Sequence, residues 1–145
     1  MKYTTKSGRE ISFYGGGVRE DLDKFFGVLL KSWVKRSAYP ASQKDPEYDF
    51  DNDPSYGQCT VTAMVVQDKF GGTIHRVRVN GGGTHYFNKI DGRYFDLTSD
   101  QFTLYNIPLL YEPNEEMSRE YVGTNADTKM RYEILKMNVE ANLEN

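Results

Sequence analysis

Three side chains between positions 59 and 96 could together activate a thiol. Cys59 is the only cysteine of the chain, His85 is one of its two histidines, and Asp96 follows in the same stretch. A thiol becomes a strong nucleophile when a nearby imidazole takes its proton, and a carboxylate can hold that imidazole in the required orientation. The order Cys, His, Asp therefore predicts an enzyme in which Cys59 attacks a carbonyl carbon.

A β-hairpin is expected to bring His85 and Asp96 together. Strands are predicted at Thr84–Ile90 and Arg93–Leu97, and the Asp91-Gly92 pair between them is typical of a two-residue type I′ turn. Such a turn fixes the pairing of the later positions, and successive side chains of a strand alternate between its faces. His85 and Asp96 should therefore lie on one face, diagonal to each other and within hydrogen-bonding reach.

The thiol is expected at the start of a helix. The sequence predicts a buried helix at Cys59–Lys69, which ends before Gly71-Gly72. A helix N-terminus carries a partial positive charge that favours a thiolate, and the free amides of its first turn can stabilise an oxyanion. Gln58 and Trp33 also carry side-chain N–H groups, so we consider them as further oxyanion donors or as residues that support the site.

Other predicted elements form the scaffold. The spacing of apolar residues predicts an amphipathic helix at Val18–Lys35 and a final helix at Ala126–Leu143. Short strands are predicted at Ile11–Tyr14 and Thr73–Val79. The segment Ser37–Pro54 is rich in Pro, Asp and Asn and has no periodicity. We expect it to be a long surface loop that leads to the cysteine, and long loops often border a functional site.

The composition is that of a globular domain. Of 145 residues, 38% are hydrophobic and 27% charged, so a single domain over residues 1–145 is expected. The net charge is -3 and the basic residues are dispersed, which argues against a nucleic-acid partner. No stretch resembles a signal peptide or a membrane span of about 20 apolar residues. Because a single thiol suits a reducing compartment, we expect a cytoplasmic protein without a membrane partner.

Several stretches of the chain match a known pattern, with the Gly-Gln-Cys segment and the segment from His85 to Asp96 as its specific parts. They are Ser32-Trp33, Asn52–Asp68, Phe70–Gly72, Gly82–Tyr86, Asp91–Thr98 and Gln101-Phe102. Together they cover about half of the chain and resemble the YunG-like family of small bacterial proteins.

More distantly, a Cys followed by His on one strand and Asp on the next resembles the transglutaminase-like and papain-like superfamily. That resemblance implies an α+β fold in which the nucleophile helix packs on an antiparallel sheet. It also implies thiol acyl-transfer or amide-hydrolysis chemistry, with Cys59 as nucleophile, His85 as general base and Asp96 as the residue that orients His85. No cofactor is expected.

Three functions remain open from the sequence. The first is an enzyme acting on a protein or peptide as a peptidase, deamidase or acyltransferase. The second is a catalytically inactive papain-like fold that binds or regulates a protein, using a surface rich in aromatic residues (11 Tyr and 8 Phe).

The third function is a metal site built from Cys59, His85, Asp96 and His75, although these residues lack the short ligand spacing of structural zinc motifs. Each residue also has a plainer interpretation. Taken alone, Cys59 would be a small buried apolar residue, and we interpret His75 as a surface residue of its strand.

Overall fold

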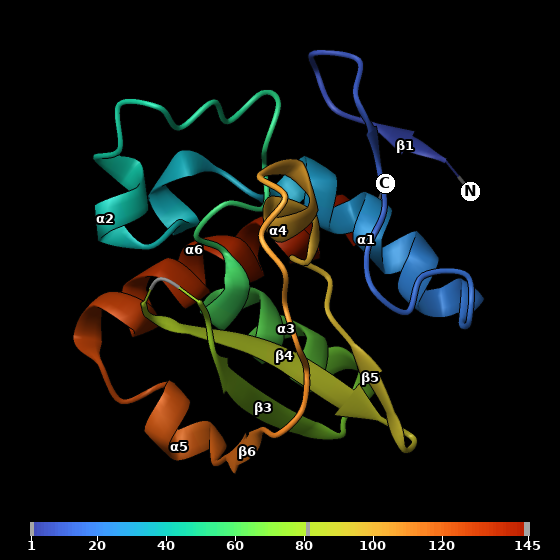
Figure 1. The fold of residues 1–145 in the computed structure, drawn as a ribbon, viewed down its shortest axis with the longest axis vertical. Coiled ribbons are helices and arrows are strands. Elements are labelled where there is room, and N and C mark those ends of the chain that lie inside the picture. The colour runs from blue at the N-terminus through green and yellow to red at the C-terminus, as the bar shows by residue number, and fades with distance from the viewer. Residues whose placement is uncertain (1, 81, 144–145) are drawn as a thin grey trace.

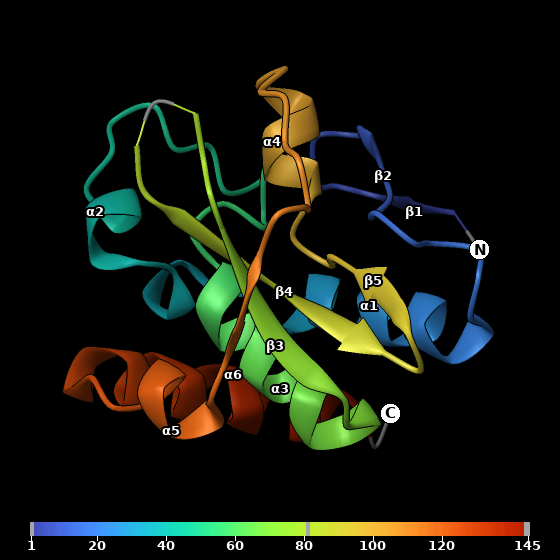
Figure 2. The same cartoon turned by 60° about the horizontal axis from the view of Figure 1, so that its bottom comes forward.

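Helix α3 (Cys59–Phe70) lies between a β-sheet and helix α6 (Ala126–Leu143), as Figure 1 and Figure 2 show. The structure is a computed structural model that describes residues 2–80 and 82–143. All residues of α3 from Val61 to Val66 are buried, because neighbouring elements cover the helix on more than one side. The buried helix predicted at Cys59–Lys69 is therefore confirmed, and Gly71, with a φ angle of 76°, ends it.

The sheet is antiparallel and has the strand order β5 (Arg93–Phe95), β4 (Thr84–Ile90), β3 (Thr73–Arg78) and β6 (Glu115–Met117). Ile90 pairs with Arg93 across the predicted two-residue turn. The turn residues Asp91 and Gly92 have φ angles of 50° and 80°. Positive values at both positions are what a type I′ turn requires, so the predicted hairpin is confirmed in its turn and register. The fold is α+β.

The return strand of this hairpin is shorter than predicted. It ends at Phe95 and not at Leu97, because the N–H of Asp96 donates to the carbonyl oxygen of Tyr14 at 3.1 Å. Strand β5 consequently pairs only with Asn88–Ile90 of β4. Within the described residues, the first half of β4 has no strand partner on that edge.

Helix α1 (Glu20–Ser32) packs against α6. It is shorter than the predicted Val18–Lys35. The N–H of Val18 instead closes a turn on the carbonyl of Gly15, and the chain is already extended at Trp33, with ψ 135°. Helix α6 has the predicted bounds. The buried stripe of α1 agrees with the apolar spacing and consists of Leu22, Phe25, Phe26 and Leu29.

The remaining elements are short. Strands β1 (Tyr3–Thr4) and β2 (Glu10–Ile11) form a separate pair. The strand predicted at Ile11–Tyr14 is therefore wrong, because only Ile11 belongs to a strand and Tyr14 forms an isolated bridge. The predicted loop 37–54 contains helix α2 (Pro40–Gln43). The others are the 3-10 helix η1 (Lys35–Ser37), α4 (Asp100–Leu104) and α5 (Arg119–Val122). None of the helices in the described ranges has the length and apolar character needed to cross a membrane.

Residues 105–114, which we call the strap, run from α4 to β6 across the face of the sheet that points away from α3 (Figure 1 and Figure 2). Tyr111 of the strap packs edge-on against Phe87 of β4, and Asn114 pairs with the ring of His75 on β3. His75 is therefore only 5% exposed. Our prediction that His75 is a surface residue is wrong, because the strap covers this face.

Replacing Val65 with Asp tests whether α3 is the central helix. Val65 is 4% exposed, so Val65→Asp would bury a charge without a partner and should destabilise the protein by at least about 3 kcal/mol. Urea unfolding followed by circular dichroism measures this difference. The matched control is Val18→Asp at a valine that is 51% exposed, where a change within about 0.5 kcal/mol is expected. Equal stability of the two variants would show that α3 is misplaced.

Candidate active site

The side chains of His85 and Asp96 form a buried hydrogen bond. Nε2 of His85 lies 2.7 Å from Oδ2 of Asp96, and both side chains are only 1% exposed. The predicted contact between the two residues is therefore present. The other carboxylate oxygen, Oδ1, accepts from the N–H and the hydroxyl of Thr98 at 3.2 and 3.3 Å, and Oδ2 also accepts from the hydroxyl of Tyr111 at 2.8 Å. These donors hold the carboxylate in one orientation.

The contact with Asp96 fixes how the imidazole of His85 is used. Because Nε2 is engaged by the carboxylate, Nδ1 is the ring nitrogen left for Cys59. The ring of Phe102 lies edge-on to the imidazole, with 4.6 Å between ring centroids, and restricts its rotation. Burial lowers the pKa of His85, but Asp96 and Cys59 together raise it well above the ordinary value of 6.5. The site thus favours the imidazolium form.

Cys59 is the first residue of α3, and the residue is half-buried. Burial raises the pKa of the thiol. The hydrogen bond and the positive charge of His85, followed by the backbone N–H of Tyr86, lower it by more, so the pKa lies below the ordinary value of 9.0. Cys59 and His85 thus favour a thiolate and an imidazolium side by side.

Cys59 and His85 open onto a cleft of about 880 Å³. Its walls come from the segment around α2, the starts of α3 and β4, helix α4 and the region where α5 leads into α6. Tyrosine rings and small polar side chains dominate the lining. The lining residues used below are Tyr39, Tyr56, Tyr86, Tyr121, Gln101, Phe102, Asp127 and Arg131.

Gln58 and Trp33 face the interior instead of the cleft. The amide of Gln58 is fully buried, accepts from the hydroxyl of Ser37 at 2.8 Å and donates to the carbonyl of Val34 at 2.9 Å. The indole N–H of Trp33 donates to the hydroxyl of Thr62 at 2.9 Å. Of the two roles considered for this pair, these contacts fit support of the site and argue against donation to an oxyanion.

Oxyanion donors are instead available from the main chain. The N–H groups of Cys59 and Thr60 belong to the first turn of α3, where no intrahelical acceptor exists. Thr62 is the residue whose N–H closes the first helical hydrogen bond, to the carbonyl of Gln58 at 3.0 Å. The sulfur and these donors lie at the same end of the helix, as attack on a carbonyl requires.

The sequence analysis assigned no role to two residues that hold the site together. Gln101 accepts from the N–H of Gly57 at 3.2 Å and donates to the carbonyl of Thr98 at 3.0 Å, so it ties the turn after Asp96 to the turn before Cys59. Tyr111 reaches Asp96 from the strap. Gln101 lies in one of the stretches that match the known pattern, but nothing in its spacing indicated a role, and Tyr111 lies in none of them. Only the three-dimensional contacts identify what the two residues do.

The metal-site hypothesis finds no support in the geometry. No group of three or more His, Cys, Asp or Glu side chains is arranged to bind a metal ion within residues 2–80 and 82–143. Both ring nitrogens of His75 are already paired, Nε2 with the hydroxyl of Thr73 at 2.7 Å and Nδ1 with Asn114 at 2.8 Å.

Comparison with known proteins places the chain in a family. The family described as YunG protein matches residues 21–144, which is most of the chain. The chain belongs to the YunG family. It is 41% identical over 75 residues to a protein of Bacillus subtilis (strain 168) named "Uncharacterized protein YunG". This match covers 52% of the chain and 57% of the length of the Bacillus protein. No solved structure matches the chain.

Asp53, in the loop that leads to the cysteine, is a buried acid. Its side chain is fully buried, and neither of its oxygens has a hydrogen-bond partner among the described residues. The hydroxyls of Tyr48 and Ser55 in the same loop are also buried and unpartnered there. Burial, and next the charge of Asp100, raise the pKa of Asp53 to about 6. The loop therefore holds a destabilising charge at neutral pH.

Asp53→Asn should stabilise the protein at pH 7.5. The pKa of Asp53 rises from an ordinary 3.8 to about 6 on folding, so the folded state binds the proton more tightly. The stability that Asp53 contributes below about pH 4 is lost as the pH rises through about 6. We expect urea unfolding to show a gain of about 3 kcal/mol for the variant at pH 7.5 and only about 1 kcal/mol at pH 4.5.

A neighbouring carboxylate serves as the control for this measurement. Asp51 is exposed, and the interaction it forms among the described residues is a long surface ion pair with Lys6, at 3.8 Å. Asp51→Asn should change stability by less than about 0.5 kcal/mol at both pH values. An effect of Asp53→Asn that is the same at pH 4.5 and 7.5 would contradict the burial of an ionised Asp53.

Proposed function

We propose that this protein is a cysteine enzyme that transfers or hydrolyses acyl groups, with Cys59 as nucleophile, His85 as acid and base, and Asp96 as the residue that orients His85. The proposal includes a papain-like or transglutaminase-like arrangement, and it is supported by the position of Cys59 at the start of a helix that packs on an antiparallel sheet. The observation that carries the proposal is the buried bond between His85 and Asp96, which leaves the second ring nitrogen to the thiol in an open cleft.

The first half of the reaction forms a thioester. The Cys59 thiolate attacks the carbonyl carbon of an amide, forming the carbon–sulfur bond while the carbonyl electron pair moves to oxygen. The N–H groups of Cys59 and Thr60 stabilise that oxyanion. As the carbon–nitrogen bond breaks, the imidazolium of His85 gives its proton to the leaving amine.

The second half regenerates the enzyme. Neutral His85 takes a proton from water, or from an acceptor amine, as that group attacks the thioester carbon. The tetrahedral adduct then expels the Cys59 thiolate, and His85 is again an imidazolium. Asp96 stabilises this charged form and stays unprotonated throughout.

The lining of the cleft favours a peptide segment as substrate. Tyr39 and Tyr121 are 55% and 58% exposed at its walls, and tyrosine rings supply contact area with little loss of side-chain entropy. The buried Arg131 is paired with Asp127 at 2.8 Å, so the charge of this wall is balanced. The same tyrosines would suit the second candidate function, a module that binds a peptide without reacting with it.

Alkylation of the single cysteine separates the two functions. If Cys59 is held as a thiolate, iodoacetamide should modify the native protein at pH 6.5 about tenfold faster than it modifies glutathione, because an ordinary thiol is only about 1% ionised there. His85→Ala should slow the reaction at least tenfold, and Asp96→Asn should slow it less. Rates are measured by intact mass, with Cys59→Ser as the control that remains unlabelled.

Two outcomes would reject the enzyme. One is a native Cys59 that reacts only after denaturation, and the other is a folded His85→Ala variant that reacts as fast as the wild type. Circular dichroism of each variant shows whether the fold is retained. In either case the peptide-binding module becomes the better description of the cleft.

A further inference from the structure

The strap delivers one phenol to the buried carboxylate of the site. The hydroxyl of Tyr111 donates to Oδ2 of Asp96 at 2.8 Å, and Nε2 of His85 lies 2.7 Å from the same oxygen. We propose that Tyr111 is a positioning residue of the site, which shares Oδ2 of Asp96 with His85 and so limits the strength of the bond between them. This inference rests on the proposed function.

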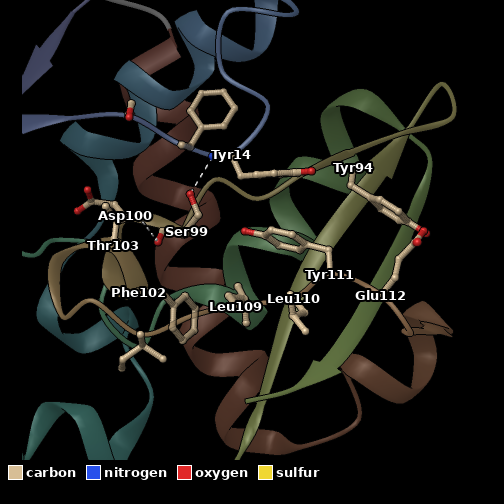
Figure 3. A pocket seen from close by; sticks show the side chains of 13 residues that line it. Tyr14, Tyr94, Ser99, Asp100, Phe102, Thr103, Leu109, Leu110, Tyr111 and Glu112 are labelled. Atoms are coloured by element: carbon tan, nitrogen blue, oxygen red, sulfur yellow. Dashed lines mark hydrogen bonds between the residues drawn. The ribbon is translucent and has the colours of Figure 1, made fainter. Parts of the chain in front are cut away.

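Tyr111 is held in place by aromatic contacts. Its ring stacks on Tyr14 with 4.3 Å between centroids and meets Phe87 edge-on at 4.9 Å. Figure 3 shows the rings of Tyr14 and Tyr111 one above the other in the lining of a second pocket, to which Phe102 also contributes. Tyr14 additionally accepts from the N–H of Asp96 through its main chain. Tyr14 therefore positions both the phenol of Tyr111 and the main chain of Asp96, whose carboxylate accepts the hydrogen bond of that phenol.

The strap is fixed to the sheet at Asn114. The amide nitrogen of Asn114 donates to the carbonyl of Tyr111 at 2.8 Å and to the hydroxyl of Tyr94 at 3.0 Å. Its oxygen pairs with Nδ1 of His75 at 2.8 Å, and Nε2 of His75 pairs with Thr73 at 2.7 Å. This chain of bonds runs from β3 to the backbone of Tyr111. It explains how an irregular segment can place a hydroxyl accurately.

Two donors on one oxygen compete for its electron density, so each bond is weaker than it would be alone. Among the described residues, the titratable side chains that interact directly with the side chains of His85 or Asp96 are Cys59 and Tyr111. Burial and Asp96 raise the pKa of Tyr111, so its hydroxyl stays a neutral donor at physiological pH. Tyr14, which contacts the ring of Tyr111, acts in the same direction.

Tyr111→Phe tests the inference because it keeps the ring and removes the hydroxyl. Without the phenol, Oδ2 serves His85 alone, and the imidazolium should keep its proton to higher pH. The effect is read in ¹⁵N-histidine spectra of the full chain carrying Cys59→Ser. The Cys59→Ser substitution removes the thiolate, whose negative charge would stabilise the proton on His85. The titration of His85 then does not depend on the reactivity of Cys59. With two histidines in the chain, His75→Gln assigns the signals.

We expect Tyr111→Phe to raise the midpoint of the His85 titration by about 0.4 to 1 pH unit, the range that one hydrogen bond supplies. The Nε2–H proton signal should also move downfield. Tyr14→Phe is the matched control, since the hydroxyl of Tyr14 makes no hydrogen bond to another described residue and its ring still stacks. That variant should change the midpoint by less than about 0.2 unit, a small fraction of one hydrogen bond.

A folded Tyr111→Phe protein with an unchanged or lowered midpoint and an unmoved Nε2–H signal would show that Tyr111 only packs, and would overturn the inference. If Tyr111→Phe does not fold, Asn114→Ala, which releases the strap from the sheet, must raise the midpoint in its place. Failure of the proposed function is seen separately, as an inert Cys59 in the wild type.

Discussion

The carboxylate of Asp96 is the group on which the rest of the structure depends. At 1% exposure it must receive hydrogen bonds from the protein, because an unpaired buried carboxylate is costly. Its donors come from different parts of the chain, namely His85 on β4, Thr98 in the following turn and Tyr111 on the strap, while Tyr14 holds its main chain. The N-terminal segment, the sheet and the strap must therefore all be in place around one residue.

The same constraint creates the place for the thiol. Because Asp96 leaves the sheet to pair with Tyr14, β5 ends early and the start of β4 keeps an open edge. Helix α3 packs against β4, and its first turn reaches this edge, where the N–H of Tyr86 and the ring of His85 favour the thiolate of Cys59. An extended β5 would cover the edge that the sulfur occupies. The early end of the strand is thus part of the site.

The sequence predicted the features that local chemistry determines. The Asp91-Gly92 turn fixes a register by itself, so the turn residues alone were enough to place His85 and Asp96 together. Apolar spacing likewise located α3 and α6. The burial of His75 and the contacts of Gln58 could not be predicted, because each depends on a segment distant in the sequence. The strap covers His75, and the side chain of Gln58 forms hydrogen bonds with Val34 and Ser37. Neither segment has a periodic pattern that reveals its partner.

The free energy needed to bury His85 and Asp96 favours the proposed catalytic role of the site over a role in binding alone. A buried ion pair contributes little to stability compared with apolar residues of the same volume, so a fold that only packed or bound a peptide would gain nothing from one. Here an imidazole and a carboxylate, each 1% exposed, lie next to a half-buried cysteine that lines a cleft. A peptide could be bound by the tyrosines of that cleft without any of the three. The proposed nucleophilic catalysis gives the buried pair and its contact with the sulfur a use, whereas binding of a peptide requires neither.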